Sequence, residues 1–359
     1  MHNPLTTMVR ERGPMTVAAF TELALYHPLH GYYSTSRQRS GAAGDFFTSV
    51  DVGPLFGEML AVQIAEIWTT LKDRQTGHFD LVEVGAGNGR LTCDILDTAA
   101  RDFPALYDDL RATLVERGAL ARQEAFNTLC QHADRVHSIG SELPYAINGV
   151  VIANELLDAF PVHLLTMTPD GLREIYIAAE DGGLRERVGA VSDPRLDAIV
   201  ADSVLPQGWR GELSLDIPAW IHRVASALMQ GCVLCFDYVS SGHAPTLIAH
   251  SRHVGGGAQW LDAPGKQDIS SHIDLTALFR AATEAGLQVA GCVDQTYFLT
   301  ALGLVNRLPA GGDMTAVRRR LAARTLIAPG GLGSTMKVIC FTKGVEGGAW
   351  RGFEGGRLT

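Results

Sequence analysis

The spacing of apolar residues along the chain changes between helical and strand-like periods, and each change predicts an element. Between residues 54 and 71 the apolar side chains recur at helical spacing, which predicts a helix that packs against the core. Downstream of it, short apolar runs predict strands near 79–84, 113–116, 135–139, 149–153, 232–236, 287–293 and 336–341. Helical periodicity between these runs predicts helices near 89–100, 119–131, 216–229, 272–285 and 313–326.

Strands that alternate with helices are typical of an α/β fold, in which helices cover both faces of a mostly parallel sheet. We expect a helical N-terminal segment over 1–75, one α/β domain over 76–343 and a glycine-rich tail over 344–359. Two insertions, at about 162–215 and 240–270, follow the fourth and fifth strands. The first carries a hairpin signal at Pro169-Asp170-Gly171. The second has the composition of a long loop over the carboxyl ends of the strands.

Composition narrows the class of protein. Apolar residues make up 46% of the chain and charged residues 19%, which is typical of a globular protein rather than a disordered one. The formal net charge of −9 argues against a general nucleic-acid or anionic-membrane surface. No apolar run is long enough to span a bilayer, and the N-terminus has no signal or transit pattern. We therefore expect a cytoplasmic protein, or a matrix protein if the chain is a processed eukaryotic one.

The cysteines and histidines do not predict a metal. Six cysteines are scattered along the chain, which fits reduced thiols in a cytosol. Cys232 and Cys235 lie in one apolar strand, where alternation points the two thiols to opposite faces. The histidines of the 240–270 segment lack thiolates or paired acids beside them. We predict no metal site.

A glycine-rich turn between the first strand and the following helix carries the cofactor prediction. Glu83 precedes the loop Gly85-Ala86-Gly87-Asn88-Gly89, whose third glycine comes one residue earlier than in the G-x-G-x-x-G fingerprint of dinucleotide sites. A carboxylate is a poor neighbour for phosphate and a good one for an ammonium group. The loop therefore favours S-adenosylmethionine, which has an ammonium and a sulfonium but no phosphate, over NAD. The alternative is a strand-to-helix turn that binds nothing.

Glu116 ends the second predicted strand, where an acid can accept hydrogen bonds from ribose hydroxyls. It lies 31 residues after Gly85, farther than the usual spacing of about 20. The chain between Asp94 and Asp109 must then contain an extra helix or loop. The alternative is an exposed glutamate at a strand end.

The fourth strand runs into Asn154, Glu155 and Asp158, and ligands of open parallel sheets bind beyond the carboxyl ends of the strands. The spacing of Glu155 and Asp158 would put both carboxylates on one face of a helical turn. Such a pair can hold a cationic nitrogen nucleophile, most obviously a guanidinium. The alternative is a capping pair, because Asn154 is a good N-cap and acids favour a first turn.

Further polar residues follow the fifth strand. Asp237 and Tyr238 come directly after it, and Asp268 and His272 could reach the same rim on the substrate side. Alternatively, Asp268 only caps the helix expected from 272.

Several strings together resemble the MidA-like methyltransferases, bacterial relatives of a mitochondrial complex I assembly-factor arginine methyltransferase. They span most of the chain and are highly specific in combination: Leu25-Tyr26-His27-Pro28, Gly31-Tyr32-Tyr33, Gly44-Asp45-Phe46-Phe47-Thr48-Ser49, Phe56-Gly57-Glu58, Glu83–Gly89, Ala153–Pro161, Phe236-Asp237-Tyr238, Pro264-Gly265 and Asp268-Ile269. The resemblance implies a Rossmann-like, class I S-adenosylmethionine-dependent methyltransferase. It also implies that Gly44–Ser49, with Asp45, Phe47 and Thr48, folds over the cofactor.

The resemblance further implies that the chain N-methylates arginine in a protein partner, such as a respiratory complex I subunit. Val239 stands where the family has glycine, and Ile248 and His250 replace an arginine and a tyrosine. These departures lie on the expected substrate side, so they bear on the acceptor more than on the cofactor. Three alternatives stay open: a methyltransferase for a small molecule or another side chain, a non-catalytic S-adenosylmethionine-binding assembly factor, and an NAD dehydrogenase.

Overall fold

The computed structural model describes residues 3–35, 48–72, 77–180, 183–201, 203–240, 246–251, 254–256, 260–345 and 350–354. The chain forms two compact units, each built from several segments. The first unit comprises Met1–Phe46, Leu157–Trp220 and Ser240–Leu275. The second comprises Phe47–Leu156, Ile221–Val239 and Thr276–Thr359. The structure thus groups the N-terminal segment with the two expected insertions, whereas the sequence-based division places its first boundary at residue 75.

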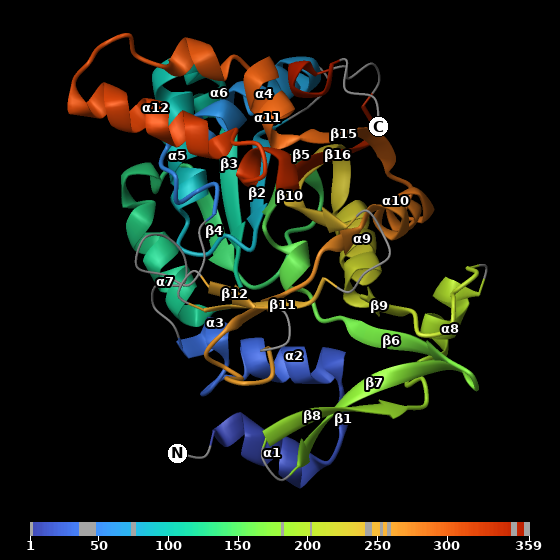
Figure 1. Ribbon diagram of the computed structural model, residues 1–359. Coiled ribbons are helices and arrows are strands. Elements are labelled where there is room, and N and C mark those ends of the chain that lie inside the picture. The colour runs from blue at the N-terminus through green and yellow to red at the C-terminus, as the bar shows by residue number, and fades with distance from the viewer. Residues whose placement is uncertain are drawn as a thin grey trace. The chain divides into compact units, whose positions relative to one another are not determined.

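The second unit contains the predicted α/β sheet, with helices packed on both sides of it (Figure 1). Its strands run in the order β15-β16-β10-β5-β2-β3-β4. Neighbours from β10 to β4 pair in parallel. The strands are β2 (Phe79–Val84), β3 (Leu110–Val115), β4 (Val136–Gly140), β5 (Ile147–Asn154), β10 (Leu228–Ser240), β15 (Gln288–Asp294) and β16 (Met336–Lys343). The predicted Rossmann-like fold is confirmed.

The helices of this sheet follow the predicted periodicity closely. Every residue of β2 is buried, because helices cover both faces of a central parallel strand. The helical elements are α4 (Leu55–Leu71), α5 (Arg90–Asp102), α6 (Pro104–Asp109), α7 (Ala119–Thr128), η2 (Cys130–His132), α9 (Asp216–Ala227), α10 (Leu275–Glu284), α11 (Gln295–Ala301), η5 (Leu304–Arg307), α12 (Met314–Leu326), α13 (Leu332–Thr335) and η6 (Arg351–Phe353).

The late strands depart in one respect from a purely parallel sheet. β16 pairs antiparallel with both β10 and β15, so the reversed strand lies one position inside the edge. β15 at the edge again runs with the parallel strands. Strand order is a property of long-range pairing, which periodicity does not encode.

Two contacts fix α4 against its neighbours in the second unit. A Cβ on Gly57 would lie 2.5 Å from the Cβ of Asp94, so the glycine lets α4 and α5 approach closely. Glu58, one residue later, is 5% exposed and receives both terminal nitrogens of the Arg319 guanidinium from α12. A bidentate pair of this kind stabilises the geometry of both helices.

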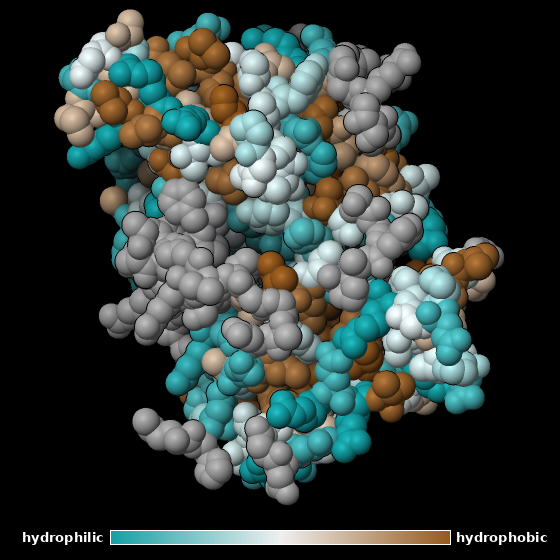
Figure 2. Space-filling view, viewed as in Figure 1, coloured by the Kyte–Doolittle hydropathy of each residue, from teal (hydrophilic) through white to brown (hydrophobic). Residues whose placement is uncertain are grey.

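Apolar side chains also reach the surface over α12 and its neighbourhood (Figure 2). Val305, Met314 and Leu321 are each more than half exposed. Scattered exposed apolar residues are common on protein surfaces. Of the helices that the structure describes, none combines the length and apolar content that a bilayer crossing requires.

The first unit is built around an antiparallel sheet in the order β1-β7-β6-β9, with β8 also paired to β7. The hairpin predicted around Pro169-Asp170-Gly171 is confirmed, since β6 and β7 pair across the turn at Asp170. The elements before the small sheet described next are α1 (Pro4–Arg12), β1 (Met15–Thr16), α2 (Val17–Tyr26), α3 (Tyr32–Thr35), η3 (Leu157–Ala159), β6 (His163–Thr168), β7 (Gly171–Glu180), β8 (Gly183–Gly189), α8 (Pro194–Val200) and β9 (Arg210–Leu213).

The 240–270 segment is not one long loop. Its described parts form a small antiparallel sheet in the order β12-β11-β13, and β14 (Ile273–Asp274) follows. These strands are β11 (Ile248–Ser251), β12 (Val254–Gly256) and β13 (Asp268–Ser270). They are too short for an apolar alternation to show in the sequence.

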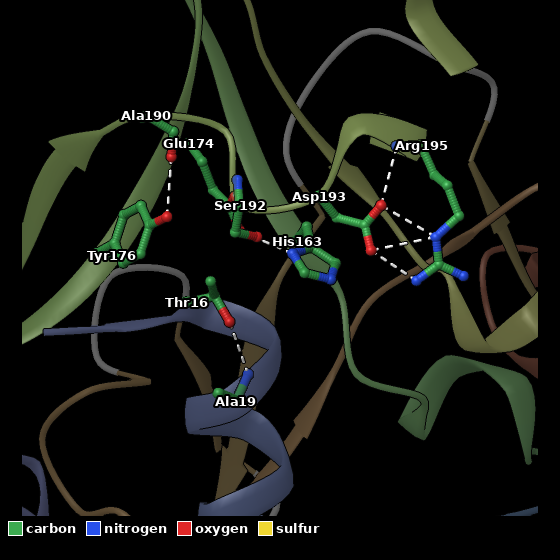
Figure 3. Close-up of polar contacts among 9 residues, drawn as sticks. All are labelled: Thr16, Ala19, His163, Glu174, Tyr176, Ala190, Ser192, Asp193 and Arg195. Atoms are coloured by element: carbon green, nitrogen blue, oxygen red, sulfur yellow. Dashed lines mark hydrogen bonds and ion pairs between the residues drawn. The ribbon is translucent and has the colours of Figure 1, made fainter. Parts of the chain in front are cut away.

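A buried contact between Glu174 and His163 anchors the hairpin of the first unit (Figure 3). Glu174 is fully buried, and its carboxylate lies 2.7 Å from Nδ1 of His163 and accepts a 2.7 Å hydrogen bond from the Ser192 amide. Burial alone would raise the pKa of Glu174, but these hydrogen bonds hold it below its usual value. Nearby, Asp193 caps α8 and also binds the Arg195 guanidinium.

Candidate functional site

The glycine loop leaves β2 in a conformation that only glycine adopts without strain. Gly85 and Gly87 have φ angles of +75° and +53°. A Cβ on Gly85 would lie 2.9 Å from Leu156 Cδ1, whereas one on Gly87 would meet nothing within 4 Å. Gly85 is therefore required for packing, and Gly87 keeps backbone open to an approaching ligand. This is the geometry expected of a cofactor loop.

Glu83 supports the helix that follows the loop. Its carboxylate is 5% exposed and accepts hydrogen bonds from the amide, at 3.2 Å, and the hydroxyl of Thr92 in the first turn of α5. Burial raises the pKa of Glu83 to about 7, although the bonds from Thr92 oppose the shift. The predicted contact of Glu83 with an ammonium group stays a prediction. Thr92 is not among the predicted site residues, because no spacing rule connects it to Glu83.

Glu116 lies beside the glycine loop, as the sequence predicts. Its carboxylate accepts hydrogen bonds from the amides of Gly87 at 3.0 Å and Gly118 at 2.6 Å. The expected extra structure before this strand is also present, since α6 occupies 104–109 between α5 and β3. A carboxylate held against the open loop is suitably placed to receive ribose hydroxyls.

Residues 48–51 form a turn that is tied to the start of α5. The amide and hydroxyl of Thr48 donate to Asp51 Oδ2 at 3.0 and 2.9 Å, and Asp51 Oδ1 forms a 2.9 Å ion pair with Arg90. Asp45 and Phe47, predicted to lie over the cofactor, fall outside the described residues. Asp51 and Arg90 are not among the predicted site residues. The Thr-x-x-Asp spacing, typical of a capped turn, was the available signal.

Glu155 occupies a strained position directly after β5. Its φ is +49°, and only Ala146 shares a positive value among the described non-glycine residues. Its amide donates to the Phe236 carbonyl at 2.8 Å, and its carboxylate accepts from the Ser49 amide at 3.3 Å and the Asn154 side chain at 3.4 Å. Strained backbone is common where a side chain must be aimed for function.

The surroundings of Glu155 disfavour the ionised form of its side chain. Burial and the nearby charges of Asp237 and Asp51 raise its pKa to about 8, against hydrogen bonds from Ser49 and Asn154. Asp237 is itself fully buried, and its carboxylate accepts hydrogen bonds from the amides of Leu156 and Tyr238 at 3.2 and 2.9 Å. A cation beside this group would offset the repulsion.

Asn154 presents an unmet acceptor to the same site. Among the described residues no donor reaches its Oδ1, although that atom is buried. A buried polar atom without a partner is costly and points to a missing ligand group. Phe236 of β10 pairs in register with Asn154 of β5. The ends of the two strands therefore lie side by side, which brings Asn154 and Glu155 close to Asp237 and Tyr238.

The predicted helical turn across Glu155 and Asp158 is wrong. The 3₁₀ turn begins only at Leu157, and the left-handed φ of Glu155 excludes it from a right-handed turn. Its amide bonds to β10 instead of starting a helix, a tertiary contact that overrides the local spacing. Asn154 accordingly ends β5 rather than capping a helix.

Asp158, Asp268 and His272 belong to the first unit. Tyr33 donates a 2.8 Å hydrogen bond to Asp268, and burial together with Asp268, Tyr26 and Asp158 raises its pKa well above the usual value. His272 is exposed, and its amide donates to the Thr246 hydroxyl at 2.8 Å.

The family departures in the first unit lie next to this cluster. On β11, Ile248 pairs with Ser270 and His250 pairs with Asp268. Two of the three departures therefore face β13, the strand that supplies Asp268. The roles of these residues on the substrate side stay predictions.

In the second unit, the described residues converge at the carboxyl ends of β10, β5, β2 and β3, four adjacent strands. The open glycine loop, the Glu116 carboxylate and the unmet Oδ1 of Asn154 fit a ligand that offers hydroxyl and ammonium donors. Three carboxyl groups, those of Glu155, Asp237 and Asp51, lie close enough at the same edge for the two aspartates to raise the pKa of Glu155.

Comparisons with known proteins agree with this geometry. The family described as "Putative S-adenosyl-L-methionine-dependent methyltransferase" matches residues 59–293, more than half of the chain. A crystal structure from Burkholderia thailandensis bound to S-adenosyl-homocysteine is 26% identical, with a TM-score of 0.85, and the match covers 98% of this chain and 95% of that one.

Two curated relatives are animal proteins. The rat mitochondrial protein arginine methyltransferase NDUFAF7 is 28% identical over 331 residues, which cover 84% of this chain and 73% of that protein. The human mitochondrial protein arginine methyltransferase NDUFAF7 is 27% identical over 352 residues, which cover 85% of this chain and 75% of that protein.

Proposed function

The chain belongs to the S-adenosyl-L-methionine-dependent methyltransferase family, and from that premise we propose that it methylates the guanidinium of arginine in a protein substrate. S-adenosylmethionine is its cofactor, consistent with the S-adenosyl-homocysteine bound in the Burkholderia structure. The arginine specificity is supported by the names of the curated relatives, all at distant identity. It rests on one observation in this chain, the Glu155 carboxylate among further acids.

The residues that would hold the cofactor are the glycine loop, Glu116 and Asn154. When bound, S-adenosylmethionine supplies a methyl group activated by a sulfonium cation. The loop backbone at Gly87 leaves space for the ligand, and Glu116 can accept from ribose hydroxyls in place of backbone amides. Asn154 Oδ1 would gain the donor that it lacks.

Glu155 would orient the acceptor and remove its proton. An arginine side chain has a pKa above about 12, so full deprotonation before the transfer is implausible. A guanidinium beside Glu155 would instead stabilise the ionised carboxylate, which burial and the neighbouring acids otherwise disfavour. The ionised carboxylate could then accept the one proton that the newly methylated nitrogen sheds, so that the methylated guanidinium keeps a single positive charge. Asp158, which belongs to the first unit, stays a prediction from the sequence.

The partner proposed from the family is a protein, with a respiratory complex I subunit as the first candidate. The animal relatives are named as mitochondrial proteins. For a bacterial chain we propose a cytoplasmic location.

Methyl-labelled S-adenosylmethionine, incubated with purified protein and lysate from a strain lacking it, tests the acceptor. Mass spectrometry should find label on arginine of a protein. Label confined to small molecules or to another side chain would reject the proposal in favour of a different methyltransferase.

Glu155→Gln separates catalysis from cofactor binding. We expect this variant to bind S-adenosylmethionine in calorimetry but to lose labelling, while Glu142→Gln, at an exposed position, keeps both. Full labelling by Glu155→Gln would exclude the proposed role. Binding without labelling of any acceptor by the parent protein would favour a non-catalytic assembly factor.

A further inference from the structure

Three potential metal ligands from two elements of the second unit face one another. Cys93 and Asp97 lie one turn apart on α5, and His132 ends the 3₁₀ helix η2. Their ligand atoms all lie within 4.8 Å of one another. Asp97 stands between the other two, with Oδ1 at 3.0 Å from His132 Nε2 and Oδ2 at 4.0 Å from Cys93 Sγ.

Tyr107 orients the imidazole of His132 through the ring nitrogen that does not face the cluster. The ring is 5% exposed, and its Nδ1 lies 2.8 Å from the Tyr107 hydroxyl. A hydroxyl can donate or accept, so Tyr107 satisfies Nδ1 in either tautomer of the neutral ring. When Nδ1–H donates to Tyr107, Nε2 keeps a lone pair directed at the cluster. Metal-binding histidines are typically fixed by such a second hydrogen bond.

The described contacts of the Cys93 thiol are with acidic and neutral groups. Cys93 Sγ lies 4.0 Å from Asp97 Oδ2 and donates to the Thr128 carbonyl at 3.7 Å. The Gln131 amide reaches both Cys93 Sγ at 3.7 Å and Asp97 Oδ1 at 2.9 Å. A thiolate and a carboxylate together offer two negative charges, which a divalent cation would balance.

We propose that Cys93, Asp97 and His132 bind one thiophilic divalent cation, with zinc as the best match, and leave the fourth position to water. Tetrahedral zinc bonds of about 2.0 Å to nitrogen and oxygen and 2.3 Å to sulfur place ligand atoms roughly 3.3–3.5 Å apart. The distance of 3.0 Å between His132 Nε2 and Asp97 Oδ1 lies within about 0.5 Å of these values. With one ligand atom from each residue, the three atoms lie within 4.8 Å of one another, so small side-chain rotations would bring them to the tetrahedral spacing. The bound cation would fasten η2 to α5, the helix that follows the glycine loop.

Cobalt provides the most informative probe, because a thiolate ligand gives a charge-transfer band and a tetrahedral site gives intense visible bands. The full-length protein, reduced and stripped of metal, is titrated with Co²⁺ and then with Zn²⁺ as competitor. We expect one equivalent to bind, with a thiolate band that zinc abolishes. Zinc should also raise the thermal midpoint of the parent protein.

Variants assign the ligands. Cys93→Ser should remove the thiolate band, and Asp97→Asn, at an exposed position, should abolish stoichiometric binding. Tyr107→Phe should weaken affinity by about tenfold or more, because it removes the support of His132. Cys130→Ser and the exposed His137→Gln serve as controls and should bind cobalt as the parent does.

Several results would overturn the proposal. These are cobalt binding without a thiolate band, retention of that band in Cys93→Ser, or its loss in Cys130→Ser. An absence of any shift in the thermal midpoint with zinc would also contradict it. Circular dichroism of each variant distinguishes loss of the site from loss of the fold.

Discussion

Replacing Glu155 with Gln should make the protein more stable at high pH than its parent. The glutamine can accept the same hydrogen bonds from Ser49 and Asn154, so the substitution removes mainly the charge. That charge is unfavourable in the folded state, where burial and the acids Asp237 and Asp51 raise the pKa of Glu155 to about 8. The variant thus isolates the electrostatic cost of the carboxylate from its contacts.

The sign follows from proton binding. The folded chain binds the Glu155 proton more tightly than the unfolded chain, whose pKa is near 4.5. The stability that this proton contributes is present below pH 4.5 and is lost as the pH rises toward 8. At about 1.4 kcal/mol for each pKa unit, the loss reaches about 4 kcal/mol by pH 8. Glutamine cannot ionise, so the variant escapes this loss.

Urea denaturation at a series of pH values between 4.5 and 8.5 measures the effect. The difference in the free energy of unfolding between Glu155→Gln and the parent should be near zero at the acidic end and should grow with pH. Glu142→Gln, at an exposed position, controls for removal of a carboxylate. A constant difference across the range, or one that shrinks as pH rises, would refute the reasoning.

Three further outcomes follow from other contacts. Arg319→Ala should lower the free energy of unfolding by about 3 kcal/mol in the same urea titration, because it leaves the buried Glu58 carboxylate without its cationic partner. Arg319→Lys should restore part of the lost free energy. Gly87→Ala should cost only about 1–2 kcal/mol of stability for its positive φ but should abolish S-adenosylmethionine binding in calorimetry; unchanged affinity would mean that the loop does not face the cofactor. Tyr33→Phe should lower the thermal midpoint, since it removes a partly buried hydrogen bond to Asp268 that is worth about 1–3 kcal/mol; an unchanged midpoint would show that this bond adds little.

Much of the second unit can be predicted from its sequence, because its strands are buried on both faces. Such strands appear as continuous apolar runs, and β2 was placed at 79–84 as the structure has it. The glycine loop and Glu116 were also predicted to lie together, since strand order in a parallel sheet brings consecutive carboxyl ends to one edge.

The wrong predictions concern residues whose backbone forms hydrogen bonds with a partner far away in the sequence. The spacing of Glu155 and Asp158 indicated a helical turn, yet the carbonyl of Phe236, on another strand, holds the Glu155 amide. Ser49 likewise bonds to Gln295, 246 positions away. Short strands such as β11 and β13 are stabilised by each other and leave no periodic signal of their own. Local pattern cannot report such pairings.

The position of β16 also has a consequence for how the protein is made. This strand comes last in the chain, yet it lies between β10 and β15 and pairs with both. During synthesis, β10 leaves the ribosome about a hundred residues before β16. Until β16 follows, the edge of β10 that will pair with it stays exposed. An unpaired apolar strand edge can recruit another chain, so nascent protein is vulnerable to aggregation over this interval. A frameshift or premature stop before residue 336 would extend that vulnerability to the finished product, which gives quality control a way to recognise incomplete chains.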